Sequence, residues 1–210
     1  MSKSKESILD GVKYTYGSDW IHKLESREHW MLYHYQQQLM EGNINAGDRV
    51  LEIGPGSGFC ANYLKSKRIN VTTLDIDEEK DADIHANLVN YEFEESYDHI
   101  LAFEVFEHIP YEKFLEVLIK LRGKCSQIFM SVPENKRRLM ELSLWLPVIK
   151  NISFSVYIPK TKITEPNHFW EVGYKNITNK RLKKDIEKAG FKIYEKSRYK
   201  GRIYALLRSV

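Results

Sequence analysis

The chain has 210 residues, of which 42% are hydrophobic and 29% charged, with 32 Lys and Arg against 29 Asp and Glu. This composition excludes a disordered chain, and the length allows one substantial domain with its own core. The two cysteines, Cys60 and Cys125, are too few for a disulfide framework or a cysteine-rich zinc module. Because the sequence shows no secretory leader and no run of about 18 apolar residues, we expect a cytoplasmic protein without a transmembrane segment.

The small net charge of +3 hides two opposite blocks. Residues 75–116 contain 14 acidic and 2 basic side chains, whereas residues 178–210 contain 11 basic and 3 acidic ones. Such asymmetry indicates either ligand or partner surfaces, or solvated faces of helices and edge strands.

Predicted elements alternate along most of the chain. Residues 1–46 are rich in aromatic and charged side chains, and we expect them to form an N-terminal helical cap. Strand patterns and helix patterns then alternate, which predicts a mostly parallel sheet with helices on both faces and one antiparallel strand at its far end. The predicted strands are 49–53, 70–75, 99–103, 127–132, 191–197 and 202–208, and the predicted helices are 59–67, 111–121 and 178–189.

One segment, residues 134–176, does not follow this alternation. It contains the apolar cluster 142–149, flanked by basic residues, and then a stretch interrupted by Pro159 and Pro166. We interpret 134–176 as an insertion or lid on the acceptor side of a single domain that spans 1–210.

The segment 50–59, Val-Leu-Glu-Ile-Gly-Pro-Gly-Ser-Gly-Phe, carries the clearest signal. Glycines at alternate positions after a strand allow a tight turn and close approach of a ligand to the backbone. Phe59 stands where the dinucleotide pattern requires Gly or Ala, which disfavours a nicotinamide-dependent oxidoreductase. Glu52 would repel a pyrophosphate and suits a cationic ligand, and Asp75, 21 residues after Gly54, stands where a ribose-binding acid is expected.

These motifs resemble those of the class I S-adenosylmethionine-dependent methyltransferases, of the type 11/12 kind. Four segments match in order over about residues 48–132: 51–58, 73–77, 83–88 and 100–109. The resemblance implies a Rossmann-like three-layer sandwich with a seven-stranded sheet, S-adenosylmethionine (SAM) as cofactor and S-adenosylhomocysteine (SAH) as product. It also implies the cofactor-binding residues, which are Glu52, Gly54, Pro55, Gly56, Gly58, Asp75, Ile76, Asn87 and Glu104.

Within that resemblance each cofactor residue has a role. Glu52 would hold the amino group of SAM, and Asp75 the ribose hydroxyls. Ile76 would pack on the adenine. Asn87 replaces the usual Asp at the adenine amino group; its amide oxygen can still accept that hydrogen bond, and a role as a turn residue is the alternative.

The run 104–108, Glu-Val-Phe-Glu-His, follows the fourth strand, where open α/β sheets place active-site residues. The candidate catalytic residues are His108, Glu104 and His168, the last being the only histidine after position 108. In small-RNA 2′-O-methyltransferases and ubiquinone-pathway O-methyltransferases a similar run resembles a divalent-metal site, so Glu104, Glu107, His108 and His168 are also candidate metal ligands. A purely structural role for Glu107 and His108 is favoured over both.

The acceptor is not identified by these motifs. A small or medium-sized molecule methylated on oxygen or nitrogen is favoured, and the aromatic residues Trp20, Trp30, Tyr33, Trp145, Tyr157, Phe169 and Trp170 would either line its pocket or pack in the core. The alternatives are an RNA 2′-O-methyltransferase, suggested by the basic C-terminal third, a lipid-like acceptor or membrane surface bound by 142–149, and a non-catalytic SAM-binding module.

Overall fold

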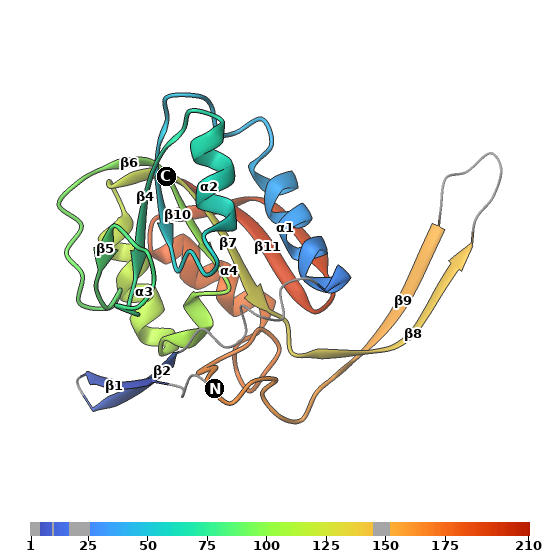
Figure 1. Cartoon of the computed structure of the whole chain (residues 1–210). Coiled ribbons are helices and arrows are strands. Elements are labelled where there is room, and N and C mark those ends of the chain that lie inside the picture. Colours follow the sequence, from blue (N-terminus) through green and yellow to red (C-terminus); the bar gives the residue numbers. More distant parts are fainter. Residues whose placement is uncertain (1–4, 10, 17–25, 145–151) are drawn as a thin grey trace.

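A seven-stranded sheet forms the centre of the computed structural model, which describes residues 5–9, 11–16, 26–144 and 152–210 (Figure 1). The strand order is β10-β11-β7-β6-β3-β4-β5. The bounds are β3 (Arg49–Ile53), β4 (Asn70–Asp75), β5 (Ile84–His85), β6 (Tyr97–Phe103), β7 (Cys125–Pro133), β10 (Phe191–Tyr199) and β11 (Arg202–Ser209).

The predicted fold class is confirmed. Strands β3, β4, β5, β6 and β7 pair in parallel, and β11 is antiparallel to both of its neighbours, β7 and β10. The seventh strand, β5, has only two residues and is therefore too short to produce a periodic pattern in the sequence.

In the described part of the chain, α-helices cover the two faces of the sheet: α1 (Arg27–Met40), α2 (Phe59–Ser66), α3 (Tyr111–Leu121) and α4 (Asn179–Lys188). Helices α1 and α2 share one core with Val50, Leu101 and Phe129, whereas α3 and α4 share the other with Leu51 and Ile100. Neighbouring residues of β3 thus enter opposite cores, as the pleat of a strand buried on both faces requires.

The N-terminal segment differs in part from the expected helical cap. Strands β1 (Lys5–Leu9) and β2 (Val12–Tyr16) form an antiparallel hairpin, and only α1 is helical among the described residues before position 47. Val12-Lys13-Tyr14-Thr15-Tyr16 has the β-branched and aromatic alternation of a strand, and Gly11 supplies the turn with a φ of 74°. Tyr14 is buried against Phe169, which anchors the hairpin to the body.

The insertion contains a second hairpin, formed by β8 (Lys136–Leu144) and β9 (Ile152–Pro159). It extends away from the central sheet as an arm (Figure 1). Residues 145–149 of the predicted apolar cluster lie outside the described residues, as does Trp20. Among the residues that the structure describes, no helix is long and apolar enough to cross a membrane.

Candidate active site

A cavity of about 1060 Å³ lies at the carboxyl ends of β3, β4 and β6. Its walls also include residues of β2 and α1, the segment 164–168 and the turn between β10 and β11. Residues of both the N-terminal segment 1–46 and the insertion 134–176 thus line this cavity.

The glycine loop that follows β3 lines one end of this cavity. Gly54 and Gly56 have φ values of 66° and 60°, and Gly58, the residue that caps α2, has 73°. These left-handed conformations are costly for residues with a Cβ. A Cβ on Gly54 would also lie 2.8 Å from Cγ2 of Val105. Gly54, Pro55 and Gly56 line the cavity, whereas the predicted cofactor residue Gly58 does not line it and instead caps the start of α2.

Glu52 lies beneath this loop and lines the cavity although it is only 5% exposed. Its Oε2 atom has no hydrogen-bond partner. Burial raises the pKa of the Glu52 carboxyl to about 8, against weaker opposing effects from the Ala61 backbone and the Cys60 thiol. The Glu52 carboxyl is therefore mostly protonated at neutral pH.

This raised pKa predicts a pH-dependent stability. Between the ordinary Glu pKa of 4.5 and about 8 the folded state keeps a proton that the unfolded state has released, so the free energy of unfolding should fall as pH rises through this window. The loss from Glu52 is about 5 kcal/mol over the whole window and about 2.5 kcal/mol between pH 6 and pH 8.5. The free energy of unfolding of Glu52→Gln should lack this loss over the same window. A fall caused by Glu107 remains in both proteins, because the pKa of Glu107 is also raised. Urea denaturation at pH 6 and pH 8.5 measures this; equal losses in the two proteins would contradict it.

Asp75 ends β4 and faces the cavity, 5% exposed. One carboxylate oxygen accepts the backbone N–H of Asp77 at 2.9 Å, and the other accepts Lys80 Nζ at 3.0 Å. Ile76 also lines the cavity. Asn87 lines it too, but its side-chain oxygen already accepts the N–H of Val89 at 3.0 Å, the turn role that was the alternative for this residue.

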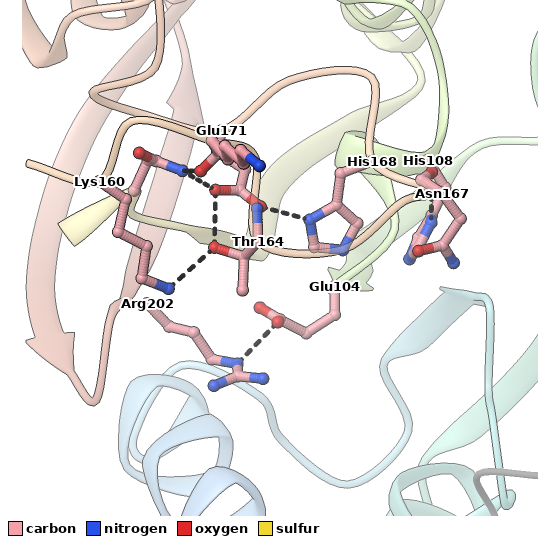
Figure 2. A network of polar contacts seen from close by, with 10 residues as sticks. Glu104, His108, Lys160, Thr164, Asn167, His168, Glu171 and Arg202 are labelled. Atoms are coloured by element: carbon pink, nitrogen blue, oxygen red, sulfur yellow. Dashed lines mark hydrogen bonds and ion pairs between the residues drawn. The ribbon is translucent and has the colours of Figure 1, made fainter. Parts of the chain in front are cut away.

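Glu104 follows β6 with a φ of 56°, a conformation that non-glycine residues rarely adopt. Two partners hold its carboxylate: Ser131 Oγ donates to Oε1 at 2.7 Å and Arg202 Nε donates to Oε2 at 2.7 Å. Figure 2 shows the Arg202 pair beneath the two histidines. Strained residues of this kind persist only where surrounding contacts hold them in place, and they are found preferentially at active sites.

His168 belongs to a network that the sequence did not reveal (Figure 2). Its Nδ1 lies 2.8 Å from Oε1 of Glu171, whose side chain is fully buried. Hydrogen bonds from His168, Asn135 and Thr164 outweigh the effect of burial and lower the pKa of Glu171 to about 2. A carboxylate on Nδ1 fixes that nitrogen as the N–H donor and leaves Nε2 as the free base.

His108 lies beside His168, with ring centroids 5.0 Å apart, and its Nδ1 is 3.3 Å from the carbonyl oxygen of Asn167. Burial, followed by the proximity of His168, lowers the pKa of His108 to about 4. His108 is therefore neutral at physiological pH.

Glu107 is fully buried next to the two histidines, and neither carboxylate oxygen has a hydrogen-bond partner within the described residues. Burial, and then the charge of Glu104, raises its pKa well above the ordinary range. One ligand atom from each of Glu107, His108 and His168 lies within 4.8 Å of the others. Glu104 is not a member of this group, since Ser131 and Arg202 hold its carboxylate.

The expected aromatic cover is divided between the cavity and the core. Tyr33 and Tyr157 line the cavity. Trp170 is 1% exposed and donates its indole N–H to the carbonyl of Phe106 at 3.0 Å, so it is a core residue. Trp30 is half-exposed on α1, where it packs against Phe59. Trp145 lies outside the described residues.

Residues 27–196 match the family described as methyltransferase domain. The chain belongs to this family, and the predicted class, an S-adenosylmethionine-dependent methyltransferase of the class I fold, is confirmed. No curated protein sequence matches the chain significantly.

Solved structures agree with this fold at low sequence identity. The DhpI-SAM-HEP complex is 17% identical with a TM-score of 0.60, covering 91% of this chain and 91% of that one. The Burkholderia thailandensis 1,6-didemethyltoxoflavin-N1-methyltransferase is 12% identical with a TM-score of 0.56, covering 100% and 97%. The small RNA methyltransferase HEN1 is 12% identical with a TM-score of 0.57, and the match covers 87% of this chain but 25% of that protein.

Proposed function

We propose that the chain transfers the methyl group of S-adenosylmethionine to a hydroxyl oxygen, or alternatively a nitrogen, of a small or medium-sized acceptor in the cavity. One observation carries this proposal. A single cavity joins the glycine loop, Glu52 and Asp75 at one end to Glu104, His108 and His168 at the other. Cofactor and acceptor sites must adjoin in this way because the methyl group passes directly between them.

The cofactor end matches SAM in shape and charge. The ammonium group of its methionine part would meet Glu52 and supply the partner that Oε2 lacks, releasing the bound proton. The ribose hydroxyls would donate to Asp75 in place of Lys80, whose flexible side chain must then move aside. Gly54 and Gly56 give the backbone access that the cofactor needs, and Ile76 and Asn87 would contact the adenine.

At the acceptor end, His168 is the best-placed base for a hydroxyl nucleophile. Its Nε2 would take the hydroxyl proton while the oxygen attacks the methyl carbon in line and the sulfur–carbon bond breaks, leaving a methyl ether and SAH. The imidazolium that forms is stabilised by Glu171, which accepts the Nδ1 hydrogen at 2.8 Å. Glu104 and Arg202 form a fixed ion pair beside this path and would position the acceptor.

A divalent metal at Glu107, His108 and His168 is the second candidate for activating the hydroxyl. The two unpartnered oxygens of the buried Glu107 favour it, as does the carboxylate of Glu171 behind His168, a common arrangement for a metal-bound histidine. A bound metal would lower the pKa of an acceptor hydroxyl.

The metal candidate predicts cation binding without any acceptor. Calorimetric titration with Mn²⁺, Mg²⁺ and Co²⁺ should give a dissociation constant that rises at least tenfold in His108→Asn and is unchanged in His34→Asn on α1, outside the cavity. Absence of binding by the intact protein would remove this candidate and leave His168 as the base.

The charge pattern does not favour an RNA acceptor. Of the 11 basic residues in 178–210, only Lys200 and Arg202 line the cavity. The others belong mainly to α4 and the edge strand β10, and several form ion pairs with acids on the same helix. RNA binding instead needs basic side chains clustered along one face next to the site.

Calorimetric titration with SAM and SAH, followed by an acceptor screen with detection of SAH, tests the proposed function. We expect both ligands to bind and methyl transfer to small hydroxylated acceptors. Failure of both to bind the folded protein would contradict the proposal. Tight binding without turnover over a broad screen would favour the non-catalytic SAM-binding module.

A further inference from the structure

The arm formed by β8 and β9 is a separate two-stranded sheet, as the β1–β2 hairpin is, but it projects away from the body (Figure 1). Within the described residues its two strands form a ladder with each other alone. Isolated two-stranded hairpins are marginally stable in water, because neither face is covered by a core. The arm therefore needs a surface that covers it.

One face of the arm is apolar. Met140 and Leu142 alternate in sequence with Glu141 and Ser143, and they pair in register with Val156 and Phe154 on the other strand. Because alternate residues of a strand lie on opposite faces, these four apolar residues share one face. Met140 is 52% exposed, Leu142 52% and Phe154 61%.

Exposed apolar residues are concentrated on this arm. Of the 13 large hydrophobic side chains that are exposed among the described residues, six lie on β8 and β9: Leu139, Met140, Leu142, Phe154, Tyr157 and Ile158. The others are scattered singly over the molecule, which is normal for a folded protein. By the same alternation Tyr157 lies on the other face, with the bulged Leu139, so the patch on this face consists of Met140, Leu142, Phe154 and Ile158 around the half-buried Val156. An exposed apolar patch of this kind marks an interaction site.

The positive charge in and next to the arm indicates the kind of surface that would cover it. The sequence 136–162, which comprises the arm and the three residues that follow it, has six basic residues and one acidic residue. Lys136 forms an ion pair with the buried Glu134 at 3.0 Å, and counting that acid still leaves an excess of four positive charges. Two copies packed arm to arm would bring these charges together, which is unfavourable. An anionic lipid surface instead attracts each Lys or Arg by about 1 kcal/mol and accepts apolar side chains below its headgroups.

We propose that the β8–β9 arm docks on an anionic lipid bilayer, with Met140, Leu142 and Phe154 inserted below the headgroups and with the excess positive charge of residues 136–162 attracting the arm to the lipid phosphates. The root of the arm contributes Lys136, Tyr157 and Lys160 to the cavity. Nine strand residues span about 30 Å, so docking holds the cavity within that distance of the bilayer. This docking is independent of the proposed methyl transfer.

Flotation of the whole chain with vesicles of phosphatidylcholine alone, or mixed with phosphatidylglycerol, tests the proposal. We expect binding to the anionic vesicles that weakens at least tenfold on neutral vesicles or in high salt. The double variant Leu142→Glu with Phe154→Glu should bind anionic vesicles at least tenfold more weakly than the unchanged protein.

The matched control is Ile119→Glu with Tyr194→Glu, which alters two similarly exposed residues outside the arm (58% and 64%) and adds the same negative charge. Its affinity for anionic vesicles should stay within about twofold of that of the unchanged protein, because salt largely screens two surface charges that lie far from the docked arm. Unchanged thermal unfolding of both variants shows that they fold. Absence of vesicle binding, equal losses in both variants, or a solution dimer that the arm variant alone disrupts would each overturn the proposal.

Discussion

Replacing Gly54 by alanine should raise the dissociation constant of SAH at least tenfold. The φ of 66° costs an alanine about 1–2 kcal/mol, and its Cβ would lie 2.8 Å from Val105, so the loop must shift at the point where the backbone meets the ligand. A tenfold loss of affinity corresponds to about 1.4 kcal/mol. Calorimetric titration of SAH into the folded variant measures the change.

Gly47→Ala is the matched control for this substitution. Gly47 has a φ of 93°, so alanine is strained there too, but a Cβ at this position would meet no atom within 4 Å and the residue does not line the cavity. We expect Gly47→Ala to lower stability with little change in SAH affinity. Equal losses of affinity in both variants would mean that general destabilisation, and not the geometry of the loop, controls binding.

Replacing His168 by alanine should lower the rate of methyl transfer to a hydroxylated acceptor about 10²- to 10⁴-fold, the usual contribution of a general base. The dissociation constant of SAH should change less than twofold, because the proposed cofactor contacts lie at the other end of the cavity. Single-turnover rates at saturating SAM, measured alongside SAH binding, separate the two effects.

Two further variants locate the effect. Glu171→Gln keeps the size of the side chain but presents an amide to His168 and Thr164, so it should lower the single-turnover rate without changing SAH affinity. If His168 is the base, His108→Ala should lower the rate less than His168→Ala does. The reason is that the hydrogen bond of His108 goes to the Asn167 carbonyl, whereas Glu171 supports His168 as a base. A larger loss in His108→Ala than in His168→Ala would contradict the assignment.

The predicted elements agree closely with the structure where a segment has a clear apolar pattern and packs in the core around the central sheet. The helix expected at 111–121 is α3 with the same bounds, and the predicted strands at 49–53 and 70–75 are β3 and β4. These segments are buried on one or both faces, so their apolar pattern follows the local geometry. The hairpin at 5–16 was not predicted, although its strands are as long as β3, because its position depends on packing of Tyr14 against Phe169, which lies far away in sequence.

The residues of the site also divide into those that local sequence predicts and those that only tertiary packing brings together. The glycine loop and Asp75 were recognisable because a strand, a turn and an acid at a defined spacing lie within about 25 residues. Glu171, Asn135, Thr164 and Arg202 were missed as site residues. Glu171 lies three residues after His168, a spacing that favours contact in a helix, but this segment is not helical and no pattern marked the acid.

The sequence by itself determined the class of the protein and the proposed cofactor end of its cavity, because contiguous residues encode a strand, its glycine turn and the acid that follows. Only the tertiary structure decided the proposed acceptor end. There Arg202 meets Glu104 across 98 positions and Asn135 meets Glu171 across 36. Contacts over such separations depend on the order of strands in the sheet and on the buried environment that a charge enters, and neither is a property of local sequence.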